Sequence, residues 1–313
     1  MRRFNALFRE RYRMAPSRLR RDAAGEAADV LAFDLAYRPP SDFDAMLAFL
    51  RMRAVDGVEA VGASEYVRAV AVRRGEARHA GHVVVRQLAR KHALRVTVSP
   101  SLARVVPAVL GRVRHAFDLA ADPREIGATL GALAAAHPGL RVPGTIDGFE
   151  LAVRAIVGQQ VSVKAARTLV GRLVAVHGGT IADAGARPAR LFPEPAAIAA
   201  LAPQDLARLG LVATRARAIH ALAEAVAAGA LTLEPGDDVE ATLERLRALP
   251  GVGDWTAQYI AMRALRWPDA FPAGDLVVRR ALGVTTSARA EAASAAWRPW
   301  RAYAVMHLWK GST

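Results

Sequence analysis

LPGVGDWTA, residues 249–257, is the stretch that decides how this chain folds. The residues just before it, 242–249, place leucines at helical spacing, and Pro250 ends that helix because a proline cannot continue it. Gly251 and Gly253 allow backbone angles that are closed to other residues, and they carry no side chain to block a close approach. The stretch therefore predicts two helices joined by a tight turn.

The second of these helices is expected from Trp255 to about Arg266, with Asp254 as its N-cap. Backbone N–H groups at the start of a helix bind anions, so the turn suits a phosphate. An ordinary turn between two helices remains the alternative, since the pattern by itself names no ligand. The turn is no dinucleotide fingerprint, because a third spaced glycine is missing, and the chain contains no GxxxxGK[ST] pattern.

A single acid, Asp275, follows Gly253 by 22 residues and precedes the apolar run 276–282. It therefore lies at or near the start of another helix, where an aspartate is often only an N-cap. The functional alternative is a carboxylate that acts on the group next to a bound phosphate. A helix start would help to keep such a carboxylate ionised.

The turn and the acid together resemble the helix-hairpin-helix DNA glycosylase superfamily. Residues 249–257 resemble its hairpin, and FPAGD at 271–275 resembles the loop that carries its catalytic aspartate. Four further segments match its alkylated-base branch, the 3-methyladenine DNA glycosylase II type. They are Tyr37–Pro40 with Ala45–Leu50, then Phe149–Val163, Trp297–Trp300 and Tyr303–Trp309. The six segments follow the order of the family and cover roughly residues 28–311.

This resemblance implies a monofunctional DNA glycosylase of base excision repair. Such an enzyme flips alkylated purines, such as 3-methyladenine and 7-methylguanine, out of duplex DNA and hydrolyses the glycosidic bond, leaving an abasic site. Asp275 is the implied catalytic residue, because a carboxylate near C1′ stabilises the cation-like sugar of the transition state. Members with lyase activity carry a Schiff-base lysine where this chain has Trp255, so no lyase activity is expected.

The resemblance also implies a base pocket formed by Trp255, Tyr259, Trp309 and Phe49. Alkylated purines carry positive charge and are attracted to aromatic faces. The alternative for Trp255 and Tyr259 is ordinary core packing, because residues four apart share one face of a helix.

The DNA-binding residues implied by the family are Gln160, Gly251, Val252, Gly253 and Thr256. The last four grip a phosphate, and the backbone carbonyls of the three hairpin residues are a candidate site for a monovalent cation. Gln160 stands where the family uses a leucine wedge to fill the gap left by the flipped base. A glutamine can fill space and hydrogen-bond to the orphaned base, and the alternative is a plain polar loop residue.

Composition excludes several classes of protein. The 313 residues include no cysteine, which rules out disulfides and cysteine-ligated zinc or iron–sulfur centres. No HExxH or HxE pattern occurs, so neither a metal nor another cofactor is expected. No apolar run is long enough to span a bilayer, and no signal peptide is apparent, which predicts a cytoplasmic protein with no membrane partner.

The formal net charge of +14 fits a nucleic-acid partner, here duplex DNA with alkylated bases, bound by a monomer. The charge is supportive only, because forty arginines against three lysines, together with many alanines, also indicate a coding bias.

The fold class expected is α+β, an N-terminal antiparallel sheet with helices followed by a mostly helical region. The domains expected are a basic segment at 1–22, an α+β domain at 23–106 and a glycosylase region at 107–313 with the hairpin at about 242–266. Residues 1–22 resemble the end of an AraC-type helix-turn-helix domain and are too short to bind DNA specifically. A basic disordered arm is the alternative.

Two other functions remain open at this point. One is a helix-hairpin-helix module that binds DNA without catalysis, which would have no need of Asp275. The other is a glycosylase for deaminated or oxidised bases. A transcription factor, suggested by residues 1–22 alone, is disfavoured because that segment lacks the rest of its core.

Overall fold

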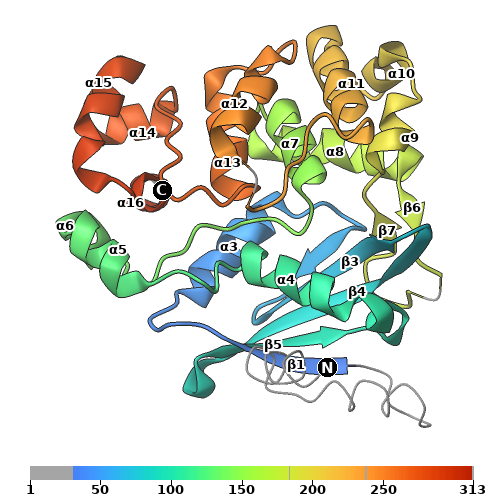
Figure 1. Cartoon of the computed structure of the whole chain (residues 1–313), viewed down its shortest axis with the longest axis horizontal. Helices are drawn as coiled ribbons and strands as arrows, with labels where there is room; N and C mark the ends of the chain where they lie inside the picture. The colour runs from blue at the N-terminus through green and yellow to red at the C-terminus, as the bar shows by residue number, and fades with distance from the viewer. Residues whose placement is uncertain (1–30, 183, 237, 312–313) are drawn as a thin grey trace.

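An antiparallel sheet and a larger set of helices pack against each other in the described part of the chain (Figure 1). The computed structural model describes residues 31–182, 184–236 and 238–311. Within these ranges the expected fold class is confirmed: the strands of the main sheet come first, and the region after them is mostly helical. The AraC-like segment predicted at 1–22 lies outside the described residues.

The main sheet has the strand order β1-β5-β4-β3-β2, with every neighbouring pair antiparallel. Its strands are β1 (Leu31–Ala36), β2 (Glu59–Val61), β3 (Glu65–Arg74), β4 (Ala77–Leu88) and β5 (Ala93–Val98). Val85 lies opposite both Tyr66 and Val96, so one apolar row runs across the centre of the sheet. The sequence did not predict β2, because three residues are too few to show the alternation of a strand.

Two helices cover one face of this sheet, α3 (Phe43–Arg53) and α4 (Val106–Ala116). Asp42 caps α3, its Oδ1 accepting from the Ala45 N–H at 2.9 Å. Leu47 and Leu110 are fully buried against the strands. Helix α4 extends from residue 106 to 116 and packs with the sheet, although most of it lies beyond the expected boundary. The domain division at 106/107 stays a prediction.

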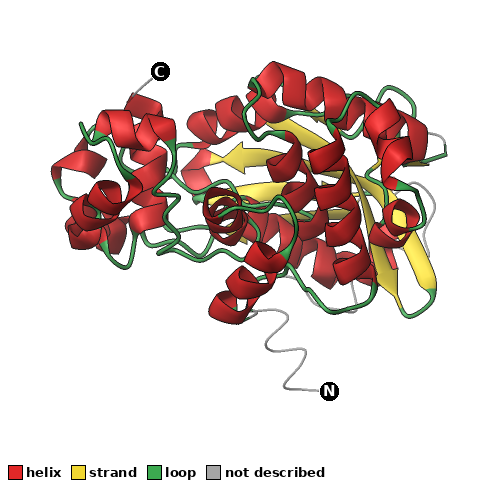
Figure 2. Ribbon diagram, turned by 90° about the horizontal axis from the view of Figure 1, so that it is seen from above, coloured by secondary structure: helices red, strands yellow, loops and turns green. Residues whose placement is uncertain are grey.

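The helical region begins after α4. Its helices are α5 (Pro123–Leu130), α6 (Ala132–Ala135), α7 (Gly148–Val157), α8 (Val163–His177), α9 (Pro195–Ala199), α10 (Pro203–Arg208), α11 (Ala213–Ala227), α12 (Val239–Ala248), α13 (Asp254–Arg263), α14 (Leu276–Ala281), α15 (Ser287–Ala293) and α16 (Arg301–Gly311). Three 3-10 turns, η1 (Ala89–Lys91), η2 (Pro100–Val105) and η3 (Ala295–Trp297), and a two-stranded sheet, β6 (Gly179–Thr180) with β7 (Arg190–Leu191), complete the described elements. Helices α5, α6 and α14–α16 form a group to one side of the sheet (Figure 2). No helix in the described ranges is both long and apolar enough to cross a membrane.

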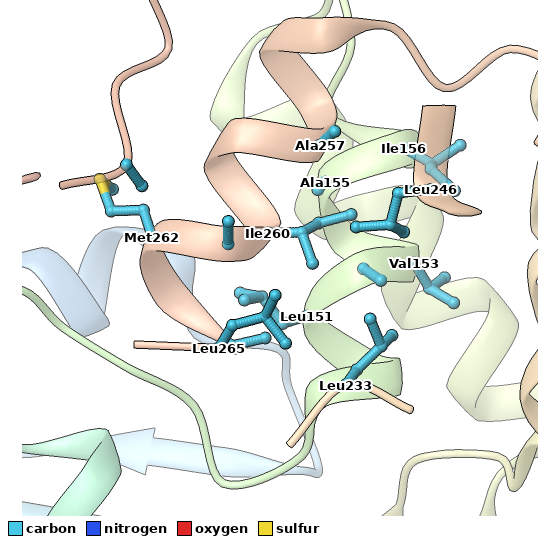
Figure 3. Packing of buried hydrophobic residues seen from close by; sticks show 14 of the residues in the cluster. Leu151, Val153, Ala155, Ile156, Leu233, Leu246, Ala257, Ile260, Met262 and Leu265 are labelled. Atoms are coloured by element: carbon cyan, nitrogen blue, oxygen red, sulfur yellow. The ribbon is translucent and has the colours of Figure 1, made fainter. Parts of the chain in front are cut away.

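Helix α7 packs deep within the helical region, and Figure 3 shows its Leu151 and Ile156 beside buried residues of other segments such as Ile260. Its side chains are buried on nearly every face, against α13 on one side and α11 on another. A Cβ at Gly148 would lie 2.0 Å from the carbonyl oxygen of Leu233, so only glycine fits at the start of this helix. The helix runs directly into the loop at 158–161, and a rigid helix thus fixes where that loop begins.

A buried cluster of charges joins the sheet to α7. Arg68 on β3 pairs with Glu150 on α7, and Arg154 on α7 pairs with Glu150 and with Glu59 on β2, the last at 2.7 Å. The Tyr66 hydroxyl donates to Glu59 at 2.5 Å. Burial alone would raise the pKa of Glu59, but Arg154 and Arg68 outweigh it and lower that pKa to about 2. The two domains therefore meet across balanced, desolvated ion pairs.

Candidate active site

Asp275 is the N-cap of α14 and also faces a cavity. Its Oδ1 accepts from the backbone N–H groups of Val277 and Val278, at 2.9 and 3.0 Å. Its two oxygens also accept from indole Nε1 groups, Oδ2 from Trp255 at 3.0 Å and Oδ1 from Trp309 at 3.2 Å. The predicted N-cap is thus observed, and the same carboxylate is half-buried and lines the cavity, while its catalytic role stays a prediction.

All four donors to Asp275 are neutral. None of the ion pairs among the described residues includes this carboxylate, although several arginines line the same cavity. Its negative charge is therefore oriented and held by hydrogen bonds but not neutralised. A group of this kind is suited to stabilising a positive charge that develops beside it.

Three aromatic rings form one wall of the cavity. Trp255 and Tyr259 stack on each other, with ring centroids 5.3 Å apart and an angle of 13° between planes. The Trp309 ring lies 6.2 Å from that of Tyr259 and is tilted by 43°. All three are half-buried and face a space of about 1050 Å³, so they are not simply core packing. The structure brings these predicted pocket residues together with Asp275.

Phe49, the fourth predicted pocket residue, comes from the other domain. It lies on α3 and lines the same cavity, which opens between the sheet domain and the helical region. Figure 1 shows α3 between the sheet and the helices that carry the rest of the site. The pocket therefore forms only where the two domains meet.

Two arginines in the pocket were missed by the sequence analysis. The Arg53 guanidinium lies 3.8 Å from the centre of the Phe49 ring, and that of Arg263 lies 4.8 Å from the same ring. Arg263 also donates to the Tyr259 hydroxyl at 2.6 Å. Burial tends to raise the pKa of Tyr259, but Arg263 and Arg53 hold it below its usual value. Each arginine follows its aromatic partner by four residues, which is the signal that would have found them.

The hairpin connects α12 and α13 as expected, with two corrections. The N-cap of α13 is Gly253, not Asp254, and the helix ends at Arg263, not near Arg266. Asp254 does not cap, because its side chain turns back to Arg247, with Oδ1 at 2.6 Å from Nη2. Gly251 has φ +77°, in the left-handed region, which a glycine adopts without strain.

The other predicted DNA-binding residues differ in exposure. Gly251 and Gly253 are exposed, and the space where a Cβ of Gly253 would stand is open, so a backbone could approach closely. Val252 is buried. Thr256 is also buried, and its hydroxyl accepts a hydrogen bond from the side chain of Gln159. Gln160 is exposed on the loop before α8, with φ +52°.

Comparisons with known proteins place the chain in a family. Residues 32–147 match the AlkA N-terminal domain, and residues 153–301 match the HhH-GPD superfamily base excision DNA repair protein. DNA-3-methyladenine glycosylase 2 of Escherichia coli is 38% identical over 278 residues, which cover 88% of this chain and 96% of that protein. The chain belongs to the HhH-GPD superfamily. As a member it is a DNA glycosylase of base excision repair.

Two further proteins are similar to this chain, one in sequence and one in fold. The probable bifunctional transcriptional activator/DNA repair enzyme AlkA of Mycobacterium tuberculosis is 39% identical over 92% of this chain, which spans 58% of that protein. A 3-methyladenine DNA glycosylase from Archaeoglobus fulgidus has the same fold, with a TM-score of 0.74 at 20% identity, covering 89% of this chain and 98% of the other.

Proposed function

We propose that this HhH-GPD glycosylase excises N-alkylated purines from duplex DNA by hydrolysis and has no lyase activity. The single observation that carries the proposal is the Asp275 carboxylate, held by two indoles and two backbone N–H groups beside an aromatic cavity. The E. coli relative, named for 3-methyladenine, supports the choice of lesion.

The chemistry begins with a base flipped out of the stack into the cavity. An alkylated purine carries positive charge, and the aromatic wall of Trp255, Tyr259 and Trp309 favours such a ring by cation–π attraction. As the glycosidic bond breaks, the electron pair leaves with the base and the sugar becomes cation-like at C1′. Asp275 stabilises that charge, and water adds to C1′ to leave an abasic site.

Hydrolysis is favoured over lyase chemistry because the hairpin position that would hold a Schiff-base lysine is Trp255. Lys310 also lines the cavity, but its ammonium lies 3.9 Å from Asp42, a residue outside the catalytic wall. Treatment with borohydride during turnover should therefore trap no covalent complex with DNA.

The hairpin supports a grip on the DNA backbone next to the flipped nucleotide. The exposed Gly251 and Gly253 leave room for a phosphate at the N-terminus of α13, where N–H groups bind anions. Gln160 is exposed on the loop before α8, where its side chain can fill the gap that the flipped base leaves in the duplex. Since every group of this site comes from one chain, we further propose action as a monomer, on DNA in the cytoplasm.

The test measures release of 3-methyladenine and 7-methylguanine from methylated duplex DNA. Asp275→Asn keeps the shape and the N-cap but removes the charge, so release should fall by roughly 10²- to 10³-fold while DNA binding persists. The matched control is Asp122→Asn, the same change at the N-cap of α5, which should keep full activity. Binding without release by the wild type would contradict the proposal and direct the same assay to hypoxanthine.

A further inference from the structure

Gln159, a residue that the chemistry above does not use, connects the wedge loop to the hairpin. Its side-chain Nε2 donates to the carbonyl oxygen of Gly251 at 3.0 Å and to the Thr256 hydroxyl at 2.9 Å. Both acceptors belong to the hairpin, 92 and 97 residues further along the chain. One half-buried amide thus spans the two segments expected to touch DNA.

The loop is fixed from its other side as well. The backbone carbonyl of Gln159 accepts a hydrogen bond from Arg215 on α11. The same helix packs behind the hairpin, because a Cβ at Gly251 would lie 3.3 Å from the Cβ of Ala218. Loop, hairpin and α11 therefore form one connected unit around Gln159.

The residue that follows is the exposed Gln160, whose φ of +52° lies in the left-handed region. Few non-glycine residues adopt this conformation without support from their surroundings. The support comes from the preceding residue, which is hydrogen-bonded through both its side chain and its backbone. The direction in which Gln160 leaves the loop is thus set by Gln159.

We propose that Gln159 is a positioning residue that fixes the wedge Gln160 relative to the phosphate-binding hairpin. The proposal rests on the DNA-binding role proposed above. When the hairpin binds a phosphate, the Gln159 amide fixes the position of Gln160 relative to that phosphate. The side chain of Gln160 then enters the DNA duplex at the gap left by the flipped base. A small misplacement would cost rate more than affinity, because insertion depends on geometry.

The same contact bears on the expected cation site at the hairpin. The carbonyl of Gly251 already accepts the amide of Gln159, so this oxygen is oriented toward the loop. A cation bound at the hairpin would share this oxygen with that amide, because a carbonyl oxygen has two lone pairs.

The experiment uses the full chain and a duplex with a tetrahydrofuran abasic analogue next to 2-aminopurine, whose fluorescence rises when it is unstacked. Gln159→Ala should bind this duplex within about threefold of wild type but lose most of the fluorescence rise, and kcat on alkylated DNA should fall about tenfold. Gln159→Glu, which cannot donate to Gly251, should behave alike.

Two comparisons separate positioning from mere stability. Gln87→Ala removes another half-buried glutamine contact, a 2.9 Å hydrogen bond to the Tyr37 hydroxyl in the sheet, and should leave the fluorescence unchanged. In the double variant with Gln160→Ala, the loss of Gln159 should have no further effect. Additive losses, or an unchanged fluorescence rise in Gln159→Ala, would overturn the proposal. The abasic duplex contains no base to excise. The fluorescence result therefore tests the role of Gln159 even if the proposed excision of alkylated purines is wrong.

Discussion

Carboxylates in two regions of this protein are held in opposite ways. At the interface between the domains, Glu59 and Glu150 are buried and each meets two guanidinium groups. In the cavity, the hydrogen bonds to Asp275 within residues 31–311 come from indole and backbone N–H groups. The two glutamates are balanced by Arg68 and Arg154, whereas no ion pair among the described residues includes Asp275.

This difference separates carboxylates that stabilise the fold from a carboxylate that can act on a bound group. A desolvated carboxylate with paired arginines attracts no further cation, and losing one partner would leave an unpaired buried charge. A carboxylate held by neutral donors is equally well oriented, but its field still reaches the cavity. Because the chain has forty arginines, a carboxylate without an arginine partner among the described residues is a notable feature.

The largest effect, on stability, is expected when one of the buried ion pairs between the sheet and α7 is broken. Glu150→Gln leaves Arg68 and Arg154 with Glu59 as their remaining carboxylate, so the free energy of unfolding should fall by about 3–5 kcal/mol. Urea titration of the variant measures this loss. Glu244→Gln, on the exposed face of α12, is the matched control and should change little. A loss below about 1 kcal/mol would mean that the pairs contribute little beyond their own desolvation.

A somewhat smaller effect should appear on acidification. The pKa of Glu59 is about 2 in the folded protein against 4.5 for a free glutamate. Since the folded value is the lower one, its stabilisation is complete above pH 4.5 and is lost as the pH falls toward 2, on the order of 3 kcal/mol. Unfolding midpoints measured from pH 7 to 3 should fall less steeply for Glu59→Gln. Parallel curves for the two proteins would contradict the assignment.

The smallest effect is expected when Asp275 is given an arginine partner like those of Glu59 and Glu150. Val277 is partly exposed, lines the cavity and lies two residues beyond Asp275. Val277→Arg would bring a guanidinium to the carboxylate, and kcat for base release should fall about tenfold, or about 1.4 kcal/mol, because the charge is already neutralised. Val277→Gln, of similar length but neutral, should retain most of the rate. Equal losses in both variants would point to steric blocking.

The hairpin and the capping position of Asp275 could be predicted because each depends on the preferences of neighbouring residues. Pro250 and the two hairpin glycines set the turn by their own backbone preferences. The N-cap at Gly253 was missed because Asp254 found a partner, Arg247, across the turn.

Contacts between distant segments could not be predicted in the same way. Gln159 meets the hairpin only after α7, α11 and α13 have packed, and Arg68 meets Glu150 across 82 residues of sequence. Neither pair has a local pattern that distinguishes it from solvent-exposed polar residues. The pocket arginines are an intermediate case, since Arg53 and Arg263 have helical spacing to their aromatic partners but no sign of a cavity.

The shared cavity has a consequence for changing which lesions the enzyme accepts. Phe49 lies before the stretch 153–301 that defines the superfamily match, and Trp309 lies after it. A library of variants confined to that stretch would reach Asp275 and the hairpin but would leave two walls of the pocket untouched. Selection for new specificity should therefore randomise α3 and α16 first, where the shape of the pocket can change while Asp275 stays as it is.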